Sequence, residues 1–109
     1  MSLDFTAVLP DEPYPSKMFA AIPLQAHAQI IDYAGSNGLK LLARMDDYWS
    51  DAVYGLEELP DLRVELSRVR LICSARFSRA ANITLLLERM DGVIEKAQQA
   101  GGYVEAIAD

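Results

Sequence analysis

The sequence predicts an α+β fold in which about three helices pack on a small sheet that includes the N- and C-terminal strands. The stretch from Leu3 to Leu9 alternates apolar residues with other residues, which is typical of a half-buried strand. Residues 103–108 alternate in the same way after the glycine pair 101–102. Between these ends, apolar residues recur at helical intervals of three and four. We expect the first and last strands to pair.

The length and composition indicate one ordinary globular domain that spans residues 1–109. The 109 residues, of which 51% are hydrophobic and 24% are charged, suffice for one hydrophobic core. No apolar run approaches the roughly 18–20 residues of a membrane span, and the first residues lack the basic region of a signal peptide. A single cysteine, Cys73, excludes an internal disulfide. We therefore expect a soluble, cytoplasmic protein.

The first half of the chain is predicted to hold a connector, a short extended piece and a helix. Prolines make residues 11–17 an extended connector, and Phe19–Ile22 is a short extended stretch. A helix is expected from Pro23, which suits a first turn, to the glycines of residues 35–38. We expect His27 to be partly exposed on it. The expected buried stripe of this helix comprises Leu24, Ala28, Ile31 and Ala34, with Ile30 alongside.

The second half is predicted to be mostly helical. The length of residues 39–45 does not decide between a short strand and a helical turn, and residues 46–55 are expected to form an acidic connector. A helix that begins at Pro60 has the clearest stripe of the chain, and a boundary near Ser78 separates it from a long helix that the glycine pair 101–102 ends. The stripe consists of Leu59, Leu62, Leu66, Val69 and Cys73.

The charge of the chain is concentrated in residues 46–61, which we call the acidic segment. The net charge is −6, and the acidic segment alone carries six acids and no base. A basic run follows it, formed by Arg68, Arg70, Arg76 and Arg79. Contacts with phosphates dominate the affinity of proteins for nucleic acids, so we do not expect nucleic acid as a partner of a chain with this acidic pole.

A calcium loop is the first specific chemistry that the acidic segment suggests. Counted from Asp47, the carboxylates of Asp51 and Glu58 stand at ligand positions 5 and 12. Position 3 is Trp49, which cannot bind calcium, and position 6 is Ala52, where the loop needs glycine. The pattern thus argues against such a loop.

Other site chemistry is equally poorly supported. His27 and Cys73 have no partners at the spacing of zinc ligands, and the glycine clusters follow helices instead of preceding them as phosphate loops do. We assign no catalytic residue, no metal ligand and no cofactor.

The acidic segment has both a local explanation and a functional one. Acids near the start of the Pro60 helix are favoured by its dipole, but this does not explain the aspartates and aromatic rings before residue 56. Aromatic rings among carboxylates are typical of a hot spot for a basic protein partner. The alternative is that Trp49 and Tyr54 anchor the turn in the core, which is slightly favoured for Trp49 taken alone. The predicted partner-binding residues are Asp46, Asp47, Tyr48, Trp49, Asp51, Tyr54, Glu57 and Glu58.

Two stretches of the sequence resemble a known class of proteins. They are LLARMDDYWSDAVYGLEELPDLRVEL and the C-terminal KAQQAGGYVEAIAD. Over roughly residues 39–109 the chain resembles small bacterial immunity-type proteins of toxin systems. The resemblance implies binding and neutralisation of a toxin and implies no catalysis.

Two further expectations concern a different function and the assembly of the chain. The alternative function is that of a small enzyme or ligand-binding domain, with a carboxylate site at Asp46, Asp47 and Asp51 or an arginine site at Arg76 and Arg79. A homodimer is expected because the strand edges are weakly guarded by charge and one helix carries more apolar residues than one core face needs. These residues are Ile83, Leu85, Leu86 and Leu87.

Overall fold

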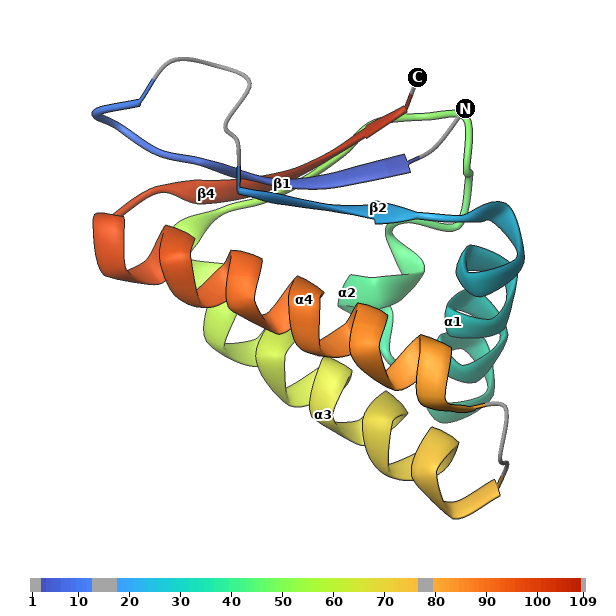
Figure 1. Ribbon diagram of the computed structural model, residues 1–109. Coiled ribbons are helices and arrows are strands. Elements are labelled where there is room, and N and C mark those ends of the chain that lie inside the picture. Colours follow the sequence, from blue (N-terminus) through green and yellow to red (C-terminus); the bar gives the residue numbers. More distant parts are fainter. Residues whose placement is uncertain (1–2, 13–17, 77–79, 109) are drawn as a thin grey trace.

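A four-stranded antiparallel sheet and the helices that cover one of its faces make up the part of the chain that the structure describes (Figure 1). This computed structural model describes residues 3–12, 18–76 and 80–108. The strands are β1 (Leu3–Val8), β2 (Phe19–Ile22), β3 (Ala52–Tyr54) and β4 (Tyr103–Ala108). The helices are α1 (Leu24–Asn37), α2 (Lys40–Ala43), the 3-10 turn η1 (Leu56–Glu58), α3 (Leu59–Arg76) and α4 (Ala80–Ala100).

The first and last strands form the centre of the sheet, and their predicted pairing is confirmed. The strand order is β2-β1-β4-β3, and the register of β1 against β4 runs from Leu3 opposite Ala108 to Val8 opposite Tyr103. The α+β class with both terminal strands in the sheet is therefore confirmed. The expectation of an unbroken connector over residues 46–55 is wrong, because Ala52–Tyr54 joins the sheet as β3. Three residues are too few for an alternation to stand out in the sequence.

The core lies between the sheet and the helices that cover it, and α3 packs along α4. Alternate residues of β1 and β4 point into it, among them Phe5 and Ala106, which are fully buried. The predicted stripe of α3 is confirmed over four of its five residues, since Leu59, Leu62, Leu66 and Val69 are all 0% exposed. The side chain of the fifth residue, Cys73, lies outside the described part.

The predicted stripe of α1 is confirmed in part, since Ala34 and its neighbour Ile30 are buried and Ile31 is half-buried against the core. The buried residues of α1 are His27, Ile30 and Ala34, whereas Leu24 is 55% exposed and Ala28 is exposed as well. The rest of the prediction failed because it placed His27 outside the core. The His27 Nε2 lies 2.5 Å from the Met45 carbonyl oxygen, and since a carbonyl only accepts, this nitrogen carries the proton. A hydrogen-bonded histidine can be buried at little cost. Helix α1 is therefore oriented with His27 towards the core.

The helix ends agree with the glycine signals. Helix α1 stops at Gly38, whose φ of 67° is left-handed, and α4 is followed by Gly101 with a φ of 70°. Residues 39–45 hold the one-turn helix α2. In the described part of the chain, no helix combines the length and the apolar character that a membrane crossing needs.

Gly102, between α4 and β4, allows the closest backbone approach in this region. A Cβ atom on Gly102 would lie 2.1 Å from the Val8 carbonyl oxygen, which the central strand pair holds in place. We predict that Gly102→Ala lowers the free energy of unfolding by about 1–3 kcal/mol, as overpacking does. Denaturant unfolding followed by circular dichroism measures this change.

Gly35→Ala is the matched control, because nothing lies within 4 Å of a Cβ atom at Gly35 in α1. Alanine there should leave the stability unchanged or raise it by up to about 1 kcal/mol. An unfolding midpoint of Gly102→Ala equal to that of the wild type would contradict the prediction.

Candidate functional site

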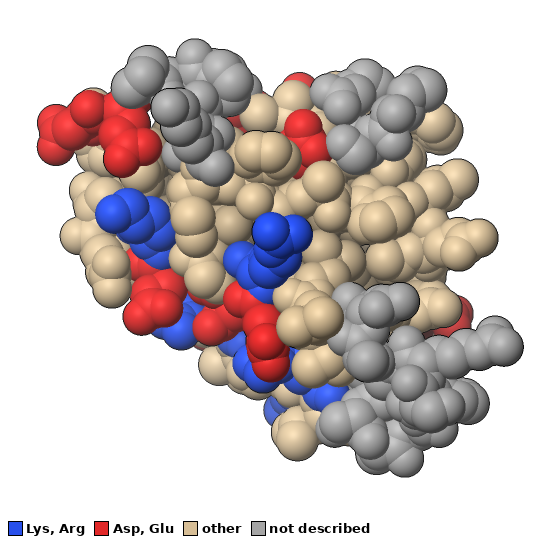
Figure 2. Space-filling model, viewed as in Figure 1, with Lys and Arg blue, Asp and Glu red and all other residues tan. Residues whose placement is uncertain are grey.

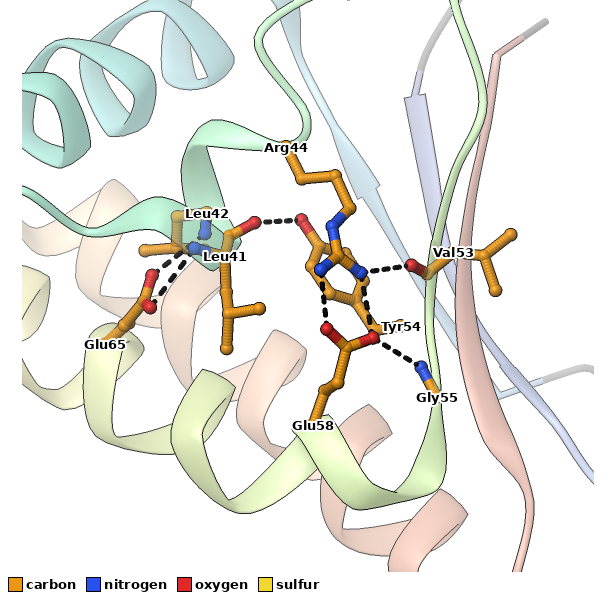
Figure 3. A network of polar contacts seen from close by, with 8 residues as sticks. All are labelled: Leu41, Leu42, Arg44, Val53, Tyr54, Gly55, Glu58 and Glu65. Carbon is orange, nitrogen blue, oxygen red and sulfur yellow. Dashed lines mark hydrogen bonds and ion pairs between the residues drawn. The ribbon is translucent and has the colours of Figure 1, made fainter.

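Arg44 fixes the acidic segment against the sheet, as Figure 3 shows. It follows α2, and its Nη1 donates to the Val53 carbonyl oxygen at 2.7 Å and to Glu58 Oε1 at 2.9 Å. Its Nη2 donates to Glu58 Oε2 at 2.5 Å, so the arginine and the carboxylate form a two-pronged ion pair. The guanidinium also lies 5.0 Å from the ring centre of Tyr54. One cation thus joins the end of α2, β3 and η1, the turn that precedes α3.

Tyr54 is the core anchor of this cluster. Its side chain is 0% exposed, and its hydroxyl donates to the Leu41 carbonyl oxygen at 2.5 Å. Burial raises the pKa of Tyr54 well above its ordinary value, so the hydroxyl stays a proton donor.

On the other side of α2, Glu65 accepts hydrogen bonds from the backbone N–H groups of Leu41 (3.2 Å) and Leu42 (2.9 Å). This carboxylate fastens the single turn of α2 to α3.

The carboxylate of Glu58 stabilises the fold. The pKa of Glu58 is lowered from its ordinary 4.5 to about 2. The main cause is the pair of hydrogen bonds from Arg44, and the second is the hydrogen bond from the N–H of Gly55 at 3.1 Å. The same pair raises the pKa of Arg44. Glu58 therefore holds its charge at any physiological pH, and that charge is matched within the chain.

Two aspartates of the acidic segment also serve the fold. Asp47 accepts the N–H of Trp49 at 2.9 Å and the hydroxyl of Ser50 at 2.8 Å, and these two bonds lower the pKa of Asp47. Asp51 accepts the N–H of Ala108 at 2.8 Å, beyond the last backbone pair of β3 and β4. Both side chains remain exposed, so they combine a structural bond with a surface charge.

The three aromatic residues of the segment have different positions. Tyr48 is 6% exposed, with its hydroxyl donating to the Ile22 carbonyl oxygen at 2.8 Å, and Tyr54 is buried as described. Trp49 is 59% exposed and meets the Tyr48 ring edge-on at 5.3 Å. The slight preference for Trp49 as a core anchor is therefore wrong, because the neighbouring tyrosine fills that place.

The predicted partner-binding residues thus divide into internal and exposed groups. Tyr48, Tyr54 and Glu58 are used mainly inside the fold. The exposed ones are Asp46, Asp47, Trp49, Asp51 and Glu57. We call the turn from Asp46 to Ser50, with Trp49 at its surface, the tryptophan turn.

Sequence reasoning missed Arg44, Glu65 and His27, which hold this region together. Arg44 was open to detection, since it is the last cation before the acidic segment. The contact of Glu65 with α2 joins residues more than twenty positions apart, so no local pattern marks it. His27 carries no local signal either.

The alternative carboxylate or arginine site receives no structural support here. Asp46, Asp47 and Asp51 line none of the surface depressions that are described, and Arg79 and the side chain of Arg76 lie outside the described residues. Among the described residues, no group of three or more His, Cys, Asp or Glu side chains is placed to hold a metal ion.

Comparison with known proteins gives no assignment. No family model, no curated protein and no solved structure matches the chain. What the protein does is therefore inferred from its own side chains and their surroundings.

The Arg44–Glu58 pair predicts a specific pH dependence of stability. Because the pKa of Glu58 is lowered in the folded chain, its contribution is complete above about pH 4.5 and is lost as the pH falls towards 2. We predict that Glu58→Gln lowers the unfolding midpoint in denaturant at pH 6. The difference from the wild type should shrink as the pH falls from 4.5 towards 2.

Glu57→Gln is the control, because it makes the same change of charge at an adjacent, exposed position outside the Arg44 cluster. It should shift the midpoint less at pH 6. Equal shifts for the two variants, or a Glu58→Gln difference that does not depend on pH, would show that the pair does not stabilise the fold.

Proposed function

We propose that this protein is a small interaction module that binds a basic protein partner through the tryptophan turn. The observation that carries the proposal is the 59% exposure of Trp49, the single tryptophan of the chain, in a turn whose neighbouring Tyr48 is buried. An exposed tryptophan supplies a large area to bury on binding, and tryptophan is among the residues most enriched in hot spots. Aspartates flank it on both sides.

The turn is ordered before any partner arrives. The Tyr48 ring supports Trp49 at 5.3 Å, and Asp47 accepts the backbone N–H of Trp49 at 2.9 Å. Tyr48 in turn is held by its hydroxyl and by the edge of the His27 ring, 4.9 Å away. A preorganised surface loses less conformational entropy on binding, which favours affinity.

The charge of the segment suits a basic partner even after its internal pairing. Arg44 matches one of the six acids, Glu58, so five negative charges remain in residues 46–61. The side chains of Asp46 and Glu57 are exposed, so they are available for steering a basic partner and for pairing with its arginine or lysine residues.

The biological role that fits this surface is neutralisation of a basic toxin, as the resemblance to immunity-type proteins implies. We further propose that the module acts in the cytoplasm, as a homodimer, and without nucleic acid as a ligand. Support for the homodimer comes from an open strand edge and from Leu85, which is 60% exposed on α4. Ile83 and Leu87, by contrast, are buried within the chain.

Capture of a partner tests the proposal. Wild-type protein immobilised in low salt should retain a basic protein from the lysate of toxin-producing cells, and both Trp49→Ala and the double variant Asp46→Asn/Glu57→Gln should weaken retention at least about tenfold. The double variant should also reduce the salt dependence of retention, because it removes two charges. Isothermal titration with the recovered protein measures both effects.

The double variant Asp32→Asn/Glu95→Gln is the matched control, since it removes the same number of exposed charges from α1 and α4. It should retain the partner as the wild type does. If Trp49→Ala binds with unchanged affinity, the tryptophan turn is not the binding surface.

A further inference from the structure

The outer edge of β2 presents unpaired backbone groups. The N–H of Ala7 donates to the Met18 carbonyl oxygen at 3.0 Å, and β1 and β2 continue from there in antiparallel register. In such a ladder the residues that bond to the neighbouring strand alternate, so Ala20 and Ile22 face β1. The N–H and C=O groups of Phe19 and Ala21 therefore point away from the sheet.

On the opposite edge of the sheet, a side chain occupies an outward backbone carbonyl. By the same alternation Ala52 and Tyr54 bond to β4, and Val53 faces outwards. Arg44 donates to the Val53 carbonyl oxygen at 2.7 Å and so occupies that edge. Blocking an edge with a charged side chain is a known protection against further strand pairing. The β2 edge, with the uncharged sequence FAAI, has no such protection among the described residues.

The β2 edge is complementary to itself. If two copies lie antiparallel about a two-fold axis through Ala20, Phe19 of each copy stands opposite Ala21 of the other. Both residues then form hydrogen-bonded pairs, which gives four backbone hydrogen bonds and leaves no outward group of Phe19 or Ala21 unpaired. The two Phe19 rings, each 51% exposed, lie diagonally across the axis within reach of each other.

An apolar depression of about 250 Å³ runs beside this edge. It lies between β2, α1 and α4, and Figure 2 shows the surface over β2 and the start of α1 without charged side chains. Leu24 and Leu85 nearby are 55% and 60% exposed and add apolar surface beside the depression. The lining residues include Ala21, Ala26, Ile83, Leu85, Leu86 and Arg89.

We propose that a second copy of this chain docks on the β2 edge, so that the two sheets join into one of eight strands and the α1 and α4 side chains beside the edge meet across the two-fold axis. This assignment of the surface rests on the homodimer proposed above and is independent of the basic partner. A two-fold contact uses the same patch on both copies, as this edge allows.

Ala21→Pro tests the strand pairing. Proline removes an N–H that points away from β1, so the monomer keeps its own hydrogen bonds, while the dimer loses two of its four. Sedimentation velocity should find the wild type near twice the 12.1 kDa monomer mass at micromolar concentration. For Ala21→Pro we expect the dimer dissociation constant to rise at least about tenfold.

Val53→Pro is the matched control, because it places proline at the outward position of the other edge strand and should leave the dimer intact. A second pair avoids proline altogether. Leu85→Glu introduces a charge beside the β2 edge and should weaken the dimer, whereas Val64→Glu, at a residue of similar exposure on α3, should not.

The outcomes distinguish whether a homodimer forms from whether it forms through the β2 edge. A wild type that stays at 12.1 kDa up to millimolar concentration overturns both the homodimer and this interface. A dimer that tolerates Ala21→Pro and Leu85→Glu, with circular dichroism unchanged, overturns the interface alone. Loss of the dimer in both of these variants and not in their controls supports it.

Discussion

One guanidinium group determines how the middle of this chain is arranged. Arg44, which follows α2, binds the carbonyl of Val53 and the face of Tyr54 in β3 and the carboxylate of Glu58 in η1. Elements as short as β3 and α2 are not stable by themselves, so they depend on contacts of this kind. Arg44 adds to the pairing of β3 with β4, the buried ring of Tyr54 and the hydrogen bonds of Glu65 to α2. The ion pair is partly exposed, with side chains 38% and 30% accessible, so its importance lies in geometry more than in electrostatic energy.

The same arrangement separates the acids that build the fold from those that are available to a partner. Glu58 is matched by Arg44, and Glu65 is engaged with the start of α2. Asp46 and Glu57 are left at the surface on either side of β3. Tyr48 and Tyr54 are buried by the same packing, which leaves Trp49 as the exposed ring of the segment. The proposed binding surface is therefore smaller than the whole acidic segment.

Arg44 also makes the two edges of the sheet unequal. It occupies the outward carbonyl of β3, whereas the outward groups of β2 have no comparable neighbour in the described part of the chain. An edge strand with open backbone groups invites pairing. The Arg44 side chain makes this difference between the two edges, and the difference is the physical basis for placing the homodimer contact at β2.

Periodicity predicted the parts of the fold whose patterns are long. The alternation of β1 and β4 and the leucine stripe of α3 lie within continuous stretches, so these strands and the buried stripe of α3 followed from the residues alone. The buried face of α1 followed only in part, because the burial of His27 depends on the distant Met45 carbonyl. Strand β3 was missed because it is short and lies among acids.

The candidate site was located by composition and not by geometry. The sequence marked the acidic segment correctly as the unusual part of the chain, but the choice between Trp49 and Tyr48 for the core depends on which ring reaches the Ile22 carbonyl. Contacts between residues far apart in sequence decide such choices, and no local pattern contains them. The three partners of Arg44, namely Val53, Tyr54 and Glu58, are likewise brought to it by the fold.

The central claim is that Arg44 protects the β3 edge from further strand pairing and fastens it to η1. Sedimentation velocity of Arg44→Ala tests this claim most directly. Arg63→Ala is the control, because it removes another two-pronged ion pair, with Asp91 at 2.9 Å and 3.0 Å, between α3 and α4 and away from the edge. With β3 unguarded, Arg44→Ala should form species larger than those of the wild type and of Arg63→Ala at equal concentration, while circular dichroism shows all three folded. Identical mass distributions for the three folded proteins would contradict the claim.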